Sequence, residues 1–174
     1  MRGDVLLNGR ANESQFAQNP LPVAHAMGVA LGVLHSSPPP ADLTGRTEAE
    51  ARAALEALTS YGPNDVPPAP FERVRVSILR DTLSNPPVDR PVVPTHGAPI
   101  VSAAVLTDSV VEFDPAGTEG LDPAERDLAI VIRSISEEFT GEVAATFLEG
   151  YLEGGGQLPH GPTLDWFGLV AAFR

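Results

Sequence analysis

The chain has 174 residues, a length typical of one folded domain with its own core, and it contains no cysteine. The absence of cysteine excludes disulfides, a thiolate nucleophile and a cysteine-bound metal, so a cytoplasmic protein is expected. Acidic residues outnumber basic ones by 23 to 11, and the resulting net charge of −12 excludes DNA and RNA as partners, because it repels their phosphate backbones.

Two further features of the composition limit the function. All 11 basic residues are arginines, so no lysine is available to form a Schiff base or to contact a nucleotide phosphate. The longest apolar run, VAHAMGVALGVL at residues 23–34, is too short and too interrupted to span a bilayer, and the sequence MRGDVLLNGR at the N-terminus lacks the apolar core of a signal peptide. No membrane partner is therefore expected.

The first half of the chain is predicted to be helical. A short extended piece at residues 5–7 precedes a helix over residues 22–35, which the prolines at 38–40 end. Thr47 and Glu50 form a capping-box pattern for a second helix, which stops before residues 61–62. A third helix is predicted over 71–83, with one apolar face formed by Phe71, Val74, Ile78 and Leu79.

The middle of the chain has the shorter period of β-strands. From residue 92 the segments VVPTHG, IVSAAVL and VVEFD are predicted to be strands, and the last two form a hairpin across the turn TDS. This hairpin ends at Asp114.

The last third is predicted to contain three helices. Asp122 and Pro123 supply the N-cap and first turn of a helix that runs to residue 139, whose SEEF end is expected to be solvated. Thr140 caps a helix that the glycines at 154–156 end, and residues 162–173 form the final helix. The histidines at 25, 35 and 160 follow no metal-binding pattern. The sequence thus predicts an α+β, mainly helical single domain over residues 1–174, with a small β-hairpin insert.

Several of these segments resemble one enzyme family. THG at residues 95–97, the hairpin ending in VVEFD and the segment DPAERDLA at 122–129 are similar to the C-terminal lobe of the aminoglycoside phosphotransferase and choline kinase family. LGVLHSSPP at 31–39 and DVLLNGR at 4–10 extend the resemblance over nearly the whole chain. It implies a protein kinase-like C-lobe whose N-lobe is absent, with residues 1–10 as a remnant of the linker between the lobes.

The resemblance also implies roles for single residues. It places Ala98 where the family has its catalytic aspartate, Ala103 at the position of the metal-binding asparagine and Ile100 at that of a second histidine. Alanine neither accepts a proton nor binds a cation, and a missing base alone removes roughly 10²–10⁴ in rate. Asp114 is then the remaining candidate metal ligand. The same resemblance assigns His96 and Gly97 a bracing role in the loop, and makes Asp127 the carboxylate that ties it down.

These substitutions lead to the expectation that the chain is not an enzyme. The predicted function is that of a non-catalytic pseudokinase without a cofactor, acting as an accessory subunit for a protein or peptide partner, or through self-association. Bacterial natural-product biosynthesis, including the maturation of ribosomally made peptides, is one setting that the resemblance implies. Two alternatives remain: a metal-assisted enzyme that uses Asp114, His96 and Glu112, and a protein that sequesters a small molecule.

Overall fold

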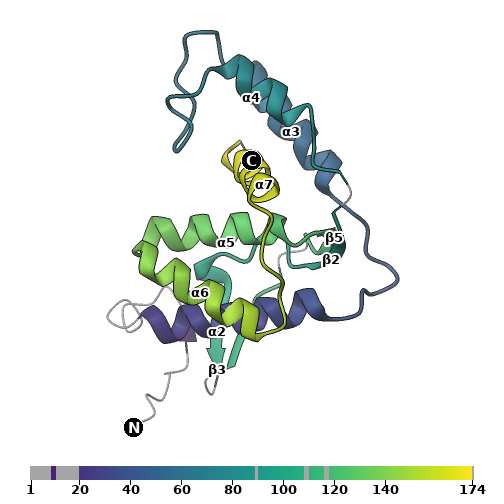
Figure 1. Cartoon of the computed structure of the whole chain (residues 1–174), viewed down its shortest axis with the longest axis vertical. Helices are drawn as coiled ribbons and strands as arrows, with labels where there is room; N and C mark the ends of the chain where they lie inside the picture. Colours follow the sequence, from purple (N-terminus) through teal and green to yellow (C-terminus); the bar gives the residue numbers. More distant parts are fainter. Residues whose placement is uncertain (1–8, 11–19, 89, 108–109, 116–117, 174) are drawn as a thin grey trace.

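The computed structural model describes residues 9–10, 20–88, 90–107, 110–115 and 118–173. Helices account for most of these residues, and two small antiparallel sheets complete the fold (Figure 1). The elements in chain order are β1 (Gly9–Arg10), α2 (Pro20–Ser36), α3 (Thr47–Thr59), α4 (Val76–Leu83), β2 (Val92–Thr95), the 3-10 helix η1 (Val101–Ala103), β3 (Ala104–Thr107), β4 (Val110–Phe113), β5 (Gly120–Pro123), α5 (Glu125–Glu138), α6 (Gly141–Glu153) and α7 (Gly161–Ala172).

Buried hydrophobic side chains form two clusters that meet at α5. The first cluster joins α2, α5 and α6 to the β3–β4 hairpin, and the second joins α3, α4 and α7. Leu128, Val131 and Ile135 of α5 belong to the first cluster, whereas Ala129 on the same helix belongs to the second. Figure 1 shows α7 between α5 and the α3–α4 pair. Helix α5 therefore connects both halves of the core.

Helices α2 and α6 pack with their backbones in close approach at four glycines. A Cβ atom on Gly28 would lie 2.1 Å from the carbonyl oxygen of Phe147, and one on Gly150 would lie 2.1 Å from that of His25. Gly32 and Gly154 make similar approaches one helical turn further along, at 2.3 Å. The spacing of four residues puts each glycine pair on one face of its helix. Sequence reasoning treated Gly28 and Gly32 as interruptions of an apolar run and Gly154 as part of a helix stop, whereas in the structure these glycines and Gly150 form the contact that sets α6 against α2.

Both sheets are antiparallel. The predicted hairpin is confirmed: β3 pairs with β4 in the register Ala104↔Phe113, and β1 pairs with the other edge of β3. The predicted strand over 100–106 is wrong in its first half, because residues 101–103 form η1. The predicted strand at residue 92 is confirmed as β2, but its partner β5 was not predicted. The extended piece expected at residues 5–7 lies outside the described residues.

Asp122 and Pro123 do not start a helix, and α5 begins at Glu125. Both residues belong to β5, and the carboxylate of Asp122 faces α3 instead. Its Oδ1 accepts hydrogen bonds from the main-chain N–H groups of Arg46 and Thr47, at 2.8 and 2.9 Å, and from the Thr47 hydroxyl at 2.7 Å. The predicted capping box is therefore also wrong, since α3 is capped by a carboxylate 75 residues away in the chain.

The helix predicted over 71–83 is shorter in the structure. Residues 71–75 form turns after Pro70, and α4 begins at Val76. Its buried face consists of Val76, Leu79 and Leu83, which leaves Ile78 52% exposed. At α6, Thr140 occupies the N-cap position as predicted, but its side chain makes no capping hydrogen bond. Within the described part of the chain, no helix combines the length and apolar character needed to cross a bilayer.

Candidate functional site

One carboxylate holds the loop between β2 and η1, residues 96–100, by hydrogen bonds to its main chain. Asp127, fully buried in the first turn of α5, accepts a hydrogen bond from the His96 N–H on Oδ2 (2.6 Å) and one from the Gly97 N–H on Oδ1 (2.9 Å). Gly97 has a φ of 92°, and a Cβ there would lie 2.1 Å from the carbonyl oxygen of Thr118. Only glycine fits this turn, so Asp127 and Gly97 together fix the direction of the loop.

Asp127 is itself held by a buried hydrogen-bonded chain from α6 and α2. Burial, with the nearby charge of Glu125, raises the pKa of Tyr151 to about 12. The carboxylate of Asp127 can only accept, so His35 Nε2 donates to Asp127 Oδ2 at 3.2 Å. In the neutral imidazole, Nδ1 then accepts the Tyr151 hydroxyl at 2.9 Å. His35, which sequence reasoning treated as one of three scattered histidines, is thus part of the group that holds the loop. We call this group, which consists of Asp127, His35 and Tyr151, the loop anchor.

Arg126 connects this anchor to α3. Its fully buried guanidinium donates from Nε to Glu50 Oε2 at 2.7 Å, bonds Glu50 Oε1 through the terminal nitrogen, and lies 3.5 Å from Asp127 Oδ1. Burial alone lowers the pKa of Arg126, but the hydrogen bonds and charge of Glu50, together with the charges of Asp127 and Asp122, raise it above its ordinary value. The positive charge therefore persists and balances the buried carboxylates.

His96 braces the loop against the end of the hairpin. Its Nε2 donates to the main-chain carbonyl of Asp114 at 2.8 Å, and its Nδ1 accepts the Ala98 N–H at 3.3 Å. The ring also packs against Phe113, with centroids 5.4 Å apart. Because main-chain groups engage both ring nitrogens, neither nitrogen is directed at a substrate. The contact of His96 with Asp114 is thus made to the main-chain carbonyl of that residue.

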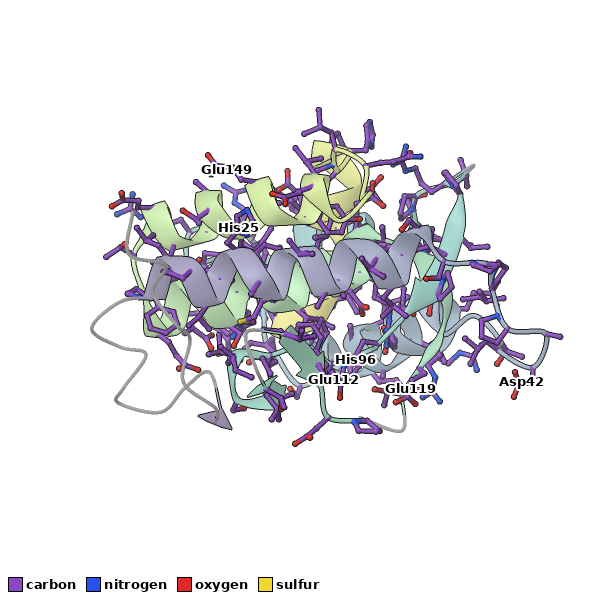
Figure 2. The ribbon with its side chains drawn as sticks, turned by 90° about the horizontal axis from the view of Figure 1, so that it is seen from below. His25, Asp42, His96, Glu112, Glu119 and Glu149 are labelled. Carbon is purple, nitrogen blue, oxygen red and sulfur yellow. The ribbon has the colours of Figure 1, made fainter. Side chains whose placement is uncertain are left out.

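The remaining predicted residues lie around this junction. Ala98 and Ala103 are half-buried and present only methyl groups, and the carbonyl of Ala103 accepts the Asp114 N–H at 2.8 Å. Asp114 and Glu112 are exposed. Figure 2 shows Glu112 and Glu119 on the same side of α2 as His96. In the ranges that the structure describes, no cluster of three or more His, Asp or Glu side chains is arranged to hold a metal ion.

A cavity of about 380 Å³ opens beside Ala98. One wall is the loop and η1, and the other is the last two turns of α5, with Arg133, Ser134, Glu137 and Glu138. The Ser134 hydroxyl accepts the Val101 N–H at 3.0 Å, and the Arg133 Nε donates to Glu137 Oε1 at 2.9 Å. Partial burial, followed by the charge of Glu137, raises the pKa of Glu138.

The two glutamates of this cavity were missed by sequence reasoning, which took SEEF for a solvated helix end. Both side chains are exposed to solvent, as that interpretation requires, but they also line the cavity beside Ala98. The sequence held one usable signal for these glutamates. They follow Asp127 on the same helix by about three turns, so a helix whose first turn holds the loop through Asp127 carries them along the same side of the fold.

Comparison with solved structures identifies the fold. A type VIII aminoglycoside-3'-phosphotransferase superposes with a TM-score of 0.76 at 21% identity, covering 97% of this chain and 66% of that one. An aminoglycoside phosphotransferase from Streptomyces rimosus, solved with ADP and streptomycin, gives 0.62 at 17% identity over 89% and 64%. A choline/ethanolamine kinase family protein from Mesorhizobium loti gives 0.60 at 19% identity over 87% and 49%. No protein-family model and no curated protein matches the sequence.

These comparisons overturn one expectation. The chain was expected not to be an enzyme, whereas the solved proteins that share its fold are named as phosphotransferases or as members of a kinase family. The chain spans between about half and just under two thirds of their length, so the likeness shows a fold and leaves catalysis by this chain to be established. The resemblance deduced from THG, the hairpin and DPAERDLA is confirmed at this level: the chain has the kinase-like fold shared by aminoglycoside phosphotransferases and choline/ethanolamine kinase-like proteins.

Proposed function

We propose that the chain forms the C-terminal, acceptor-binding lobe of a phosphotransferase-type protein, and that the cavity beside Ala98 binds a small cationic acceptor. The observation that carries this proposal is the pairing of a rigidly held loop with an acidic wall. Asp127 fixes the loop by two main-chain hydrogen bonds, and Glu137 and Glu138 face the same cavity from α5.

The charge of the cavity favours a cation. Arg133 and Glu137 neutralise one another at 2.9 Å, which leaves the carboxylate of Glu138 to balance a ligand. The pKa of Glu138 is raised by partial burial and by Glu137, and a bound ammonium group would lower that pKa again. A volume of about 380 Å³ falls within the range of small-molecule sites, roughly 300–1,000 Å³.

Phosphoryl transfer also requires a nucleotide, a metal and a proton acceptor, and the methyl group of Ala98 supplies none of them. We therefore propose that a second polypeptide segment, from a longer form of this protein or from a partner, covers the hairpin and brings the nucleotide-binding groups. Val110, which is 59% exposed at the start of β4, and the exposed carboxylates of Glu112 and Asp114 lie on the surface that this segment would cover. Asp114 is the side chain we assign to the metal.

Calorimetric titration of the chain tests the acceptor site. Streptomycin, choline and ethanolamine are suitable probes because the neighbours' names point to them. Saturable binding of at least one amine is expected, with an affinity that rises as the pH rises through the raised pKa of Glu138, because only the ionised carboxylate attracts the cation. Glu138→Gln should weaken binding several-fold and remove this pH dependence, whereas Glu142→Gln, an exposed substitution on α6, should change neither.

Two results would count against the proposal: no amine binds, or Glu138→Gln leaves affinity and pH dependence intact. A phosphate-release assay with ATP and Mg²⁺, run on the chain alone and on material purified from its host, tests the second segment. Turnover by the host material and none by the isolated chain is expected, and equal turnover by both would contradict the need for that segment.

The accessory role in the maturation of ribosomally made peptides stays a prediction, as does a cytoplasmic location. Co-purification from the host addresses the first, and cell fractionation addresses the second. Recovery of the chain without any protein or peptide partner would remove the support for an accessory role.

A further inference from the structure

A second cavity borders the loop anchor at His35 and Tyr151. It has a volume of about 310 Å³ and is enclosed by the end of α2, the start of α5 and the segment that joins α6 to α7. The buried side chains of His35, Tyr151 and Glu125 line it together with Arg90. None of its lining residues lines the cavity proposed for the acceptor.

One side of this cavity is formed by the segment after α6, whose close approach to Tyr151 depends on glycines. Gly155 has a φ of 93°, in the region that favours glycine, and a Cβ on Gly156 would lie 2.4 Å from the ring of Tyr151. The segment thus crosses directly over the tyrosine ring before it reaches Leu158 and Pro159 at the mouth. The rest of the lining combines apolar residues, among them Pro91 and Val93, with the polar side chains of Ser36 and Gln157.

Arg90 and Glu125 face one another in this cavity, and each keeps one hydrogen-bonding atom unused. A terminal nitrogen of Arg90 and the main-chain N–H of His160 both donate to Oε1 of Glu125, at 2.5 and 2.9 Å. The Nε atom of Arg90 is buried and has no hydrogen-bond partner in the described part of the chain. The hydrogen bonds that the structure gives Glu125 leave its Oε2 for an occupant.

Buried donors and acceptors are normally paired, because an unpaired one costs the free energy of its lost hydration. An occupant that pairs both atoms must offer an acceptor to Arg90 and a donor to Glu125. The two side chains carry opposite charges and neutralise each other, so a neutral ligand with separated charges suits them better than a net anion or cation. Pro91, Val93 and Leu158 offer apolar contacts for a small hydrocarbon side chain.

We propose that this cavity is a second ligand site, which binds a small zwitterion of the size of an amino acid, with its carboxylate on the guanidinium group of Arg90 and its ammonium group on Glu125 Oε2. The site is independent of the acceptor cavity. It contacts Tyr151 and His35, so its occupant lies directly against the hydrogen-bonded chain that ends at Asp127.

Nuclear magnetic resonance of the four histidines gives a direct test on the full chain. The probes are glycine, alanine, valine and leucine, with acetate and methylamine as single-charge controls. The His35 imidazole signals should shift saturably with at least one amino acid. His25, which faces Glu153 at 3.1 Å outside the cavity, should not shift, and neither single-charge control should bind comparably.

Two variants check the location. Arg90→Gln should weaken binding by about 10- to 100-fold, the equivalent of one hydrogen bond to a charged group, and Arg52→Gln on the exposed side of α3 is its matched control. Leu158→Trp fills the mouth at a side chain that is 76% exposed. It should therefore block binding without disturbing the core, even if Arg90→Gln fails to fold. The proposal is overturned if no amino acid shifts His35 at millimolar concentration, if acetate alone binds equally well, or if Leu158→Trp binds like the parent chain.

Discussion

Tyr151 makes the stability of this protein depend on pH in a range where few other groups titrate. Burial raises the pKa of its hydroxyl from 10.0 to about 12. Below the lower value the folded and unfolded chains both keep the proton, and the stabilisation is fully present. As the pH rises from 10 to 12, the unfolded chain loses the proton while the folded chain holds it, so the free energy of unfolding falls. A shift of two units corresponds to about 3 kcal/mol.

The composition makes this test unusually clean, because the chain has no lysine, the side chain that would titrate in the same range. Urea unfolding at several pH values between 9 and 12, on the parent chain and on Tyr151→Phe, measures the effect. At neutral pH the variant should be less stable by about 1–3 kcal/mol, because His35 Nδ1 loses its donor.

The difference between the two proteins should close toward pH 12 as the parent loses its advantage. Tyr61, the second tyrosine, is present in both, so its ionisation cancels in the comparison. Parallel loss of stability by both proteins over the whole range would refute the assignment of a buried, protonated Tyr151.

Three further substitutions probe the contacts that carry the site. Gly28→Ala should destabilise the fold by more than about 3 kcal/mol, because its Cβ would meet the Phe147 carbonyl at 2.1 Å. The control Gly168→Ala has nothing within 4 Å of the added Cβ and should be neutral or stabilising by up to about 1 kcal/mol. Thermal unfolding that ranks the two variants in reverse would contradict the packing argument. Asp127→Asn should lower the free energy of unfolding in urea by about 3–5 kcal/mol, because one oxygen that accepts a loop N–H is replaced by a donor. The same variant should weaken amine binding beside Ala98, and unchanged binding would show that the loop does not shape that cavity. Asp122→Ala should lower the free energy of unfolding by about 1–2 kcal/mol through the lost cap of α3, while Thr47→Ala, which removes one of the three donors, should lower it less. Faster hydrogen exchange confined to the main-chain amides in the first turn of α3 is expected. Unchanged protection of these amides would argue against a cap supplied from β5.

The sequence by itself determined the elements whose signals are local. The apolar spacing along α5, the hairpin of β3 and β4, and the glycine and proline stops of α2 and α6 follow from periodicity and turn chemistry within a few residues. The THG and DPAERDLA segments also indicated the kinase-like fold through their resemblance to a known family. The side chain of Asp127 indeed meets the His96 and Gly97 amides in the structure.

The tertiary structure alone decided which partners the polar residues take. Thr47, Glu50 and Asp122 formed two local capping patterns in the sequence, yet all three bond across the fold: Asp122 caps α3, and Glu50 pairs with Arg126. A polar side chain can be satisfied by a distant buried partner as well as by a local one, so its hydrogen-bonding capacity does not identify the partner. The periodicity of the sequence also carries no information about which distant segment comes near. The acidic wall at Glu138 and the cavity between Arg90 and Glu125 have the same origin, since they exist only where helices and loops distant in the chain meet around α5.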